Sequence, residues 1–364
     1  MFTDDEEKRI VKFVTDRVNL GVGVDFHQLS CVLQELLLEL SKGDKERHIP
    51  ASWVKCYPES TFVRRFAERN NISLRRTMAL SHARACLTVY DLKLWFSNIR
   101  ERFFENPDFS EVWKNPRRIF NQDETALEMG SEHQIVLAPK GHTGPLYNTG
   151  GSSREHVTLS VTVGADGSVA GMRVVYSGKR RSKEEKELEE TLPTDGVTGP
   201  WRFSKSPKGY VNRIIFLEIL RDLKDYVEKE NIEKPVILFI DGFSGHLGLS
   251  VAEFCSEFGI QLILLRSNMT HVLQPLDVKI FGPAKTAIRA RNHHWHADNP
   301  TRPLNKRSLI SEVVRPAFEE VFSKKETIIK AFKVTGLCPF DPLAPDFNKL
   351  KPGEKFQRGE SSPG

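Results

Sequence analysis

The sequence has few cysteines, no long apolar run and no apolar leader. Only five of its 364 residues are cysteine, and they are scattered and odd in number. None is spaced as Cys-x-x-Cys, which argues against a disulfide framework and against a zinc site. No apolar stretch approaches the roughly 20 residues that a membrane helix needs, and the opening Met-Phe-Thr-Asp-Asp-Glu-Glu is acidic where a secretory signal would be basic. We expect a soluble, intracellular protein that does not contact a membrane.

The charge of the chain permits a polyanionic partner without requiring one. The formal net charge is +5 and the pI is about 8.8. Clustered basic side chains are better evidence for nucleic-acid binding than the total charge is. A length of 364 residues suggests about two domains.

The first 105 residues have the pattern of helices. Apolar residues recur at three- and four-residue spacing, as in Ile10, Phe13, Val14 and then Leu29, Val32, Leu33. Thr3 and Glu6 match a capping box at the start of the first helix. We expect a small all-α domain over residues 1–105.

The pattern changes after residue 106 and predicts an α/β domain. Strands are expected at 119–121, 157–163, 172–176, 236–240 and 261–265, and helices at 212–230, 250–258 and 304–335. Gly164 to Gly167 have the composition of a hairpin turn. This order indicates a mixed sheet flanked by helices over 106–300, a helical extension over 301–349 and a polar, disordered tail over 350–364.

Three aspartates stand where they could share metal ions. Asp123 and Asp241 each follow an apolar strand, and the carboxyl ends of parallel strands face the crevice in which ligands bind. Asp277 lies further along and is also expected where a strand ends. Three carboxylates can hold a pair of Mg²⁺ ions about 4 Å apart and so support phosphodiester cleavage. The alternative for each aspartate taken alone is a cap of a turn or helix.

The words around these aspartates resemble a known superfamily. They read Asn121-Gln-Asp123-Glu-Thr, Asp241-Gly-Phe-Ser-Gly-His246 and Thr270-His271-Val-Leu-Gln274-Pro-Leu-Asp277. The chain resembles DDE transposases of the pogo, Tigger and Jerky branch, which also includes centromere protein B. The resemblance implies a ribonuclease H-like fold and a DNA endonuclease with Asp123, Asp241 and Asp277 as catalytic metal ligands for Mg²⁺ or Mn²⁺.

The same motifs imply supporting residues. His246 and His271 would orient the carboxylates from behind, and Lys285 would contact a DNA phosphate. The alternatives are an ordinary loop histidine for His246 and a solvated helix lysine for Lys285. Glu124 is interpreted as structural or as a support for its neighbour Asp123.

Three short motifs stand out in the helical domain: Phe62-Val-Arg-Arg-Phe66, Asn71-Ile-Ser73-Leu74-Arg75 and Ser81-His-Ala-Arg84-Ala85. With them the domain resembles the second helix-turn-helix module of centromere protein B and of Tigger transposases. Five of its arginines would contact double-stranded DNA: Arg64, Arg65, Arg69, Arg75 and Arg76. The alternative is a helical bundle with a basic solvent face. Members of this branch usually carry a further helix-turn-helix before this one, so either the gene product is shortened or the DNA-reading half is missing, and full site-specific binding is in doubt.

The combined interpretation is a nuclear protein, derived from a transposase, that binds and cuts DNA. The segment Lys179-Arg-Arg-Ser-Lys183 is a candidate nuclear-import signal or, equally, a solvated charge run. The competing interpretation is a domesticated DNA-binding protein that keeps the fold and no longer cleaves. A homodimer is left open.

Overall fold

The computed structural model divides the chain into two compact units, Met1–Val89 with Phe347–Gly364, and Tyr90–Asp346. The structure describes residues 2–19, 24–43, 49–50, 53, 58, 60–73, 87–104, 107–127, 157–180, 183–193, 196–241, 249–266, 268–299, 302 and 304–350. The division between units lies near residue 89 and not near the predicted residue 105. The physical reason is the helix that begins at Val89, which packs on the larger unit.

The described helices of the first unit pack around one apolar cluster. They are α1 (Asp4–Asn19), α2 (Phe26–Gly43) and α4 (Ser60–Arg69). Leu33 of α2 and Phe66 of α4 are fully buried at its centre. The predicted capping box is confirmed, because the Thr3 amide donates to Glu6 Oε2 at 2.9 Å and the Glu6 amide donates to Thr3 Oγ1 at 3.4 Å.

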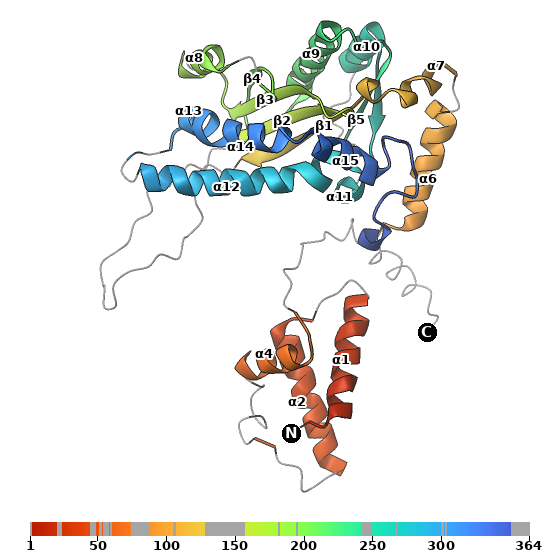
Figure 1. The fold of residues 1–364 in the computed structure, drawn as a ribbon, viewed down its shortest axis with the longest axis vertical. Coiled ribbons are helices and arrows are strands. Elements are labelled where there is room, and N and C mark those ends of the chain that lie inside the picture. Colours follow the sequence, from red (N-terminus) through yellow and green to blue (C-terminus); the bar gives the residue numbers. More distant parts are fainter. Residues whose placement is uncertain are drawn as a thin grey trace. The chain divides into compact units, whose positions relative to one another are not determined.

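The second unit holds one sheet and most of the helices (Figure 1). Its strands are β1 (Ile119–Leu127), β2 (Val157–Gly164), β3 (Val169–Ser177), β4 (Trp201–Ser206), β5 (Val236–Ile240) and β6 (Ile260–Leu264). Its α-helices are α6 (Val89–Ile99), α7 (Pro107–Ser110), α8 (Lys183–Thr191), α9 (Arg213–Lys229), α10 (Leu249–Phe258), α11 (Thr270–Leu273), α12 (Phe281–Asp298), α13 (Lys306–Ser308), α14 (Arg315–Phe322) and α15 (Lys325–Thr335). π-helical segments cover Arg100–Phe104, η5 (Leu276–Ile280) and Leu309–Val314, and short 3-10 turns cover Val112–Lys114 and Pro116–Arg118. A further 3-10 turn, Phe347–Leu350, belongs to the first unit.

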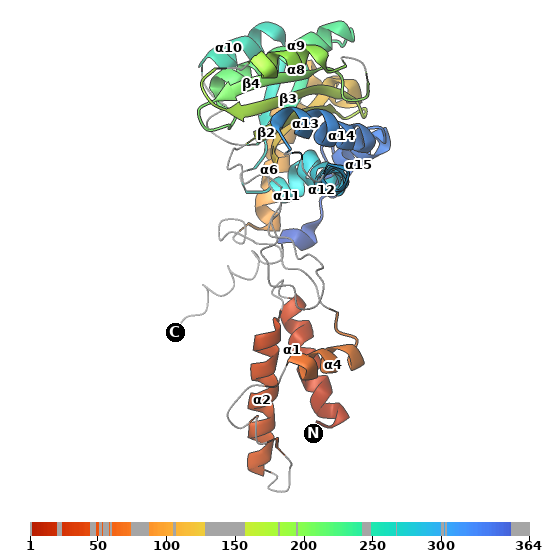
Figure 2. The ribbon, with the colours of Figure 1, turned by 90° about the vertical axis from the view of Figure 1, so that its left-hand side faces the viewer.

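The sheet combines an antiparallel meander with parallel strands. Its order is β4-β3-β2-β1-β5-β6. Strands β1, β2 and β3 pair antiparallel, whereas β5 pairs parallel with β1, β6 with β5, and β4 with β3. Figure 2 shows α9 and α10 on one side of this sheet and α11 to α15 on the other. The prediction of a ribonuclease H-like domain with a mixed sheet flanked by helices is confirmed.

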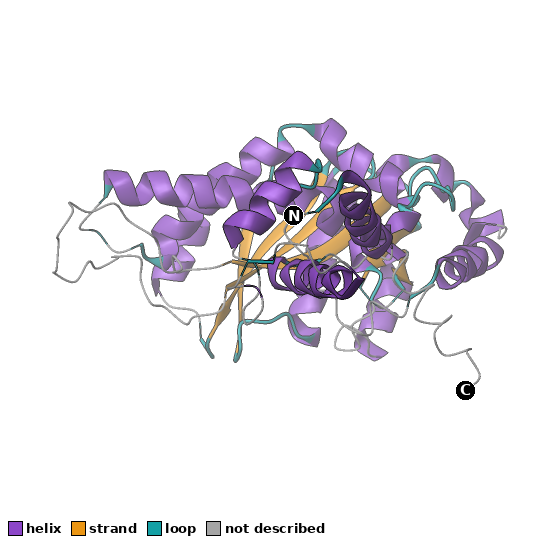
Figure 3. Ribbon diagram, turned by 90° about the horizontal axis from the view of Figure 1, so that it is seen from below, coloured by secondary structure: helices purple, strands orange, loops and turns teal. Residues whose placement is uncertain are grey.

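The strands form one sheet, drawn in orange in Figure 3. Each face of this sheet has its own apolar contacts. On one face, Phe120, Leu238 and Ile240 pack against the buried side of α9, including Leu220 and Leu223. On the other, Trp201 of β4 meets Phe318 of α14 edge to face, with ring centroids 6.2 Å apart. No helix in the described part of the chain is long and apolar enough to cross a membrane.

The outer edge of β6 is covered by α6. Two carbonyls of this edge have side-chain donors: Trp95 Nε1 donates to Leu264 O at 3.0 Å, and Gln261 Nε2 donates to Leu262 O at 2.9 Å. The side chains of Asn98 and Ile99 lie beside the same strand. This packing is what joins α6 to the larger unit.

Two strands differ from the prediction. β1 was expected to end before Asp123 but continues to Leu127, because β2 pairs with it along this whole length. β4 was not predicted at all; its buried Trp201 and Phe203 flank the exposed Arg202, but Ser204 and Ser206 are buried as well. The predicted helix at 304–335 is also interrupted between α14 and α15, at Ser323 and Lys324.

Candidate active site

Asp123 and Asp241 occupy matching positions on two neighbouring parallel strands. Asn121 of β1 is the partner of Phe239 of β5 in the last pair of that ladder. Two residues further along each strand stand Asp123, which still pairs with β2, and Asp241, which follows the end of β5. Adjacent strands lie about 4.8 Å apart. Their side chains therefore start from the same end of the sheet and, by alternation, from the same face.

The prediction that Asp277 stands at the end of a strand is wrong, because Asp277 lies in the helical segment η5. It is the second residue of η5, and its neighbour Leu276 donates its backbone N–H to Asn121 Oδ1 at 3.4 Å. Burial raises the pKa of the half-buried Asp123 carboxyl well above its usual range, and the nearby charge of Asp277 raises that pKa further. Hydrogen bonds from the Glu124 amide and the Gln274 side chain act in the opposite direction. Asp123 and Asp277 are thus brought together.

The chemistry of these donors suits a hard cation. All three candidates supply carboxylate oxygens, which Mg²⁺ and Mn²⁺ prefer. A carboxylate whose pKa is raised by a neighbouring carboxylate, as that of Asp123 is, would gain from a divalent ion between the two. Within the described residues, no group of three or more His, Cys, Asp or Glu side chains is arranged to hold a metal ion. Convergence of all three aspartates on one metal site remains a prediction.

The other predicted residues of this region are distributed differently. His271 lies half-buried on α11, one turn before Gln274. Lys285 is exposed on α12, eight positions after Asp277. Glu124 accepts a hydrogen bond from Gln122 Nε2 at 3.0 Å, which fits its interpretation as a structural residue. His246 lies outside the described residues.

The sequence motifs include two amide side chains, Asn121 and Gln274, for which no role was predicted. Both side chains are 0% exposed, and Asn121 Nδ2 donates to Gln274 Oε1 at 2.6 Å. A polar residue directly after the apolar pair Ile119 and Phe120 was the signal that could have singled out Asn121, because a buried polar group needs partners.

Comparison with known proteins identifies the family. The model of the family described as "DDE superfamily endonuclease" matches residues 155–336, which is half of the chain and includes Asp241 and Asp277. The chain belongs to this family. Asp123 lies before the matched segment, so its assignment rests on the geometry of β1 and on the Asn121 motif.

Two curated relatives share part of the DDE domain. One, from Cochliobolus lunatus, is called "MFS-type transporter clz9" and is 26% identical over 228 residues, 62% of this chain and 23% of that protein. The other, from Homo sapiens, is called "Pogo transposable element with KRAB domain" and is 22% identical over 226 residues, 58% of this chain and 34% of that protein. The matched segments thus span about a quarter to a third of these relatives.

Solved structures of Mos1 transposase are also similar. The mariner Mos1 paired-end complex with Mg is 12% identical, with a TM-score of 0.46 over 90% of this chain and 79% of that chain. The catalytic domain of Mos1 mariner transposase is 13% identical, with a TM-score of 0.36 over 80% of this chain and 100% of that chain.

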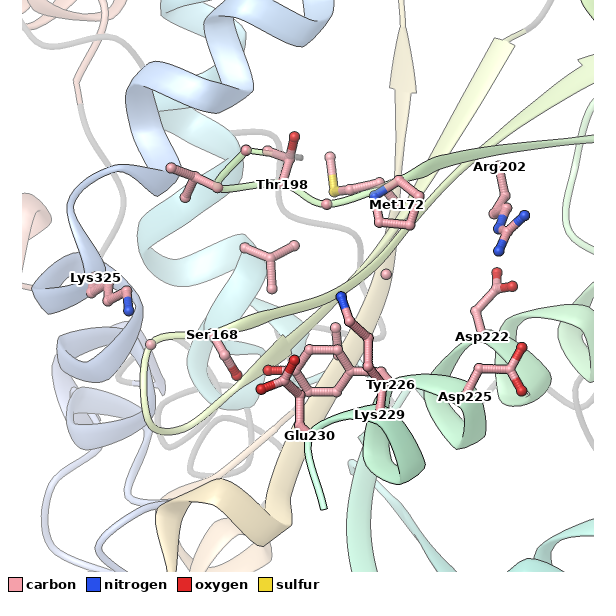
Figure 4. A pocket seen from close by; sticks show the side chains of 18 residues that line it. Ser168, Met172, Thr198, Arg202, Asp222, Asp225, Tyr226, Lys229, Glu230 and Lys325 are labelled. Carbon is pink, nitrogen blue, oxygen red and sulfur yellow. The ribbon is translucent and has the colours of Figure 1, made fainter. Parts of the chain in front are cut away.

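A separate pocket lies at the opposite end of the DDE sheet. It has a volume of about 660 Å³ and is lined by the start of β3, the loop before β4, one side of α9 and Lys325 (Figure 4). The β2–β3 turn on its rim is held to the first residue of β1, because the Ala165 amide donates to Ile119 O at 2.8 Å. Four residues of strand, about 13 Å, separate Ile119 from Asp123. None of the three candidate aspartates lines this pocket.

The arginines predicted to bind DNA have unequal surroundings. Arg64 and Arg65 are exposed on α4. Arg69 is engaged within the protein: its Nε donates to Glu7 Oε1 at 3.0 Å and its guanidinium lies over the rings of Phe62 and Phe66. Arg75 and Arg76 lie outside the described residues.

Proposed function

We propose that this DDE endonuclease hydrolyses phosphodiester bonds of double-stranded DNA with the help of Mg²⁺ or Mn²⁺. The observation that carries the proposal is the placement of Asp123 and Asp241 at matching positions of adjacent parallel strands, with Asp277 close enough to raise the pKa of Asp123. The family description and the acidic donor set support it.

In this proposal Asp123, Asp241 and Asp277 hold the metal. A bound pair of divalent ions would supply a nucleophilic water, stabilise the leaving oxygen and neutralise phosphate charge. In this arrangement Asp123 contributes from β1, Asp241 from the position just after β5, and Asp277 from η5. Gln274 donates to the Asp123 carboxylate and thereby favours the ionised form that a metal needs. His246 and His271 are proposed to support these carboxylates.

Basic side chains on α12 and α4 are proposed to contact DNA. Lys285 and Arg289 are exposed on α12, and no carboxylate among the described residues forms an ion pair with either. They are four residues apart and so share one face of the helix that follows Asp277. Arg64 and Arg65, with Arg75 and Arg76, would contribute from the first unit, which we propose to be a helix-turn-helix module.

The nuclear location and the homodimer remain proposals. The nuclear location agrees with a DNA substrate and with the exposure of Lys179 and Arg180 at the start of the candidate import segment. The domesticated DNA-binding protein is the alternative. Intact aspartates at all three positions favour the active nuclease.

The decisive experiment compares cutting and metal binding in one protein preparation. Supercoiled DNA is incubated with the full chain and with Mg²⁺ or Mn²⁺, while the Tm is measured with and without Mn²⁺. We expect metal-dependent nicking and a Tm that rises with Mn²⁺, because a ligand that binds only the native state stabilises it. Asp241→Asn should lose both effects and keep its affinity for DNA.

Glu124→Gln is the matched control. This change also removes one carboxylate charge, one residue from Asp123, but it preserves an acceptor for Gln122. It should retain nicking and the Mn²⁺ effect. Wild-type protein that binds DNA but neither nicks it nor responds to Mn²⁺ would overturn the proposal in favour of the domesticated DNA-binding protein.

A further inference from the structure

The buried side chain of Asn121 forms hydrogen bonds to the backbone next to Asp241 and next to Asp277. Its Nδ2 donates to Phe239 O of β5 at 3.0 Å, two residues before Asp241. Its Oδ1 accepts from the Leu276 amide at 3.4 Å, the residue before Asp277. Asn121 itself stands two residues before Asp123 on β1. The three chain segments that carry the aspartates therefore meet at this amide.

Gln274 completes the arrangement. Its Oε1 accepts from Asn121 Nδ2 at 2.6 Å, and its Nε2 donates to Gln122 O at 3.2 Å. The Gln274 side chain also donates to the carboxylate of Asp123. Both amides are fully buried, and every one of these bonds joins segments that are distant in the sequence.

We propose that Asn121 and Gln274 form an amide clamp that positions the three aspartates for metal binding. This inference rests on the proposed function, and it assigns positioning roles to two residues that contact no metal themselves. Burying an amide is unfavourable for folding unless the amide forms hydrogen bonds, whereas burying an apolar side chain at position 121 would carry no such penalty. The amide is useful here because it offers two donors and one acceptor, as Phe239 O, Gln274 Oε1 and the Leu276 amide require.

Metal binding should depend strongly on the clamp, because the clamp fixes the positions of the metal ligands. A metal site needs its ligands held within a fraction of an ångström, and partners behind the ligands typically account for a factor of about 10 to 100 in metal affinity. The β1–β5 ladder ends at Asn121, so beyond that point no backbone pairing between these strands fixes Asp123 relative to Asp241. The η5 segment has no strand pairing at all. Beyond the end of the β1–β5 ladder, the side-chain hydrogen bonds of Asn121 connect β1 to β5 and to η5.

The first test measures Mn²⁺ affinity of the full chain by electron paramagnetic resonance. Asn121→Leu refills the volume of the side chain without its hydrogen bonds, and Gln274→Met does the same for its partner. Each should weaken Mn²⁺ binding at least about tenfold. The double variant should weaken Mn²⁺ binding by less than the product of the two single effects, because both single variants already lose the hydrogen bond that the two side chains share.

Gln122→Ala is the matched control. Gln122 is a buried amide on the same strand, with bonds of 3.0 Å to Glu124 and Ser160, and its side chain contacts none of the three aspartates. This variant should lose stability and keep Mn²⁺ affinity within about twofold of wild type. Equal weakening in Gln122→Ala and Asn121→Leu, or wild-type affinity in Asn121→Leu, would overturn the clamp.

The second test needs no metal, so it separates the clamp from the proposed function. Hydrogen exchange of the metal-free protein is followed in the peptide that contains Leu276 and in peptides from β2 and β3. Asn121→Leu should speed exchange at Leu276 at least about tenfold and leave β3 unchanged, because the lost acceptor is that of Leu276 alone. Unchanged exchange at Leu276 would refute the clamp. Wild-type protein that binds no Mn²⁺ would refute the metal-dependent nuclease while leaving this measurement decisive for the clamp.

Discussion

Arg69 has a different role from the arginines beside it on α4. Its guanidinium donates to Glu7 of α1 and lies 5.2 Å from the ring centroid of Phe66. Asn70 donates to the same Glu7 carboxylate at 2.7 Å. These contacts lower the pKa of Glu7, chiefly through the Arg69 hydrogen bond. Arg69 therefore joins α1 to α4.

We predict that Arg69→Ala lowers stability, whereas the double change Arg64→Ala with Arg65→Ala weakens DNA binding. Arg69→Ala should cost about 1 kcal/mol of stability, since the ion pair is partly exposed and the ring contact is modest. The double change should reduce the slope of DNA affinity against salt by about two. Thermal unfolding and a salt series of DNA binding measure both. A flattened salt slope in Arg69→Ala alone would contradict this assignment.

At the residue scale, the sequence predicted which residues are candidates better than it predicted the structural environment and the partners of each. Asp241 follows its strand as expected, but Asp123 lies inside β1, because pairing with β2 continues where pairing with β5 stops. The run of arginines predicted one basic surface, and it could not indicate that Glu7, 62 positions away, would pair with Arg69. Partners that are distant in sequence are not encoded in local spacing.

Helix α12 presents basic side chains in two environments. Lys285 and Arg289 are exposed, whereas Arg291 forms an ion pair with Glu320 of α14 at 3.0 Å. No acidic residue occurs in α12 before its last residue, Asp298. One face of the helix therefore remains available to an anion.

We predict that Lys285→Ala with Arg289→Ala weakens DNA binding and lowers the salt slope by up to about two, because each side chain neutralises a phosphate. Arg291→Ala removes the same charge from the same helix and is the control. Its slope should stay close to that of wild type. Fluorescence anisotropy over a salt series distinguishes the three proteins, and an equal change in all of them would mean that only net charge matters.

At the element scale, prediction succeeded where one signal dominated. The apolar run at 236–240 gave β5 with its observed limits, and Asn212 caps α9 by accepting from the Ile215 amide at 3.0 Å. β4 escaped prediction because only Trp201 and Phe203 of its six residues are apolar, whereas every residue of β5 is apolar. The pairing of β4 with β3 is a tertiary contact, which propensity does not contain.

For the whole molecule, two separate apolar clusters predict two unfolding transitions. Phe66 belongs to the cluster of the first unit and Leu223 to the cluster beside α9. Phe66→Ala and Leu223→Ala should each cost about 3–4 kcal/mol, since both side chains are buried. Scanning calorimetry should show that each change shifts a different transition. Two changes that shift one common transition equally would show that the units unfold together.

At this scale the predicted α/β class and ribonuclease H-like layout were correct, because short motifs identified the family. The boundary between the units was not predictable in the same way. Residues 90–99 have the helical period of the residues before them, yet Trp95 bonds to Leu264, 169 positions later. Periodicity reports the secondary structure of a segment and not the core on which it packs.

The bond from Trp95 to β6 bears on how the catalytic unit can be isolated. An uncovered edge strand offers its carbonyls and amides to other chains and so promotes aggregation. α6 and the Gln261 side chain occupy the Leu264 and Leu262 carbonyls of this edge. A fragment that starts at residue 106 would lose α6 and with it the Trp95 donor to the Leu264 carbonyl. A soluble, monodisperse catalytic fragment should therefore begin before Val89, because α6 then shields the edge of β6 from pairing with another copy of the chain.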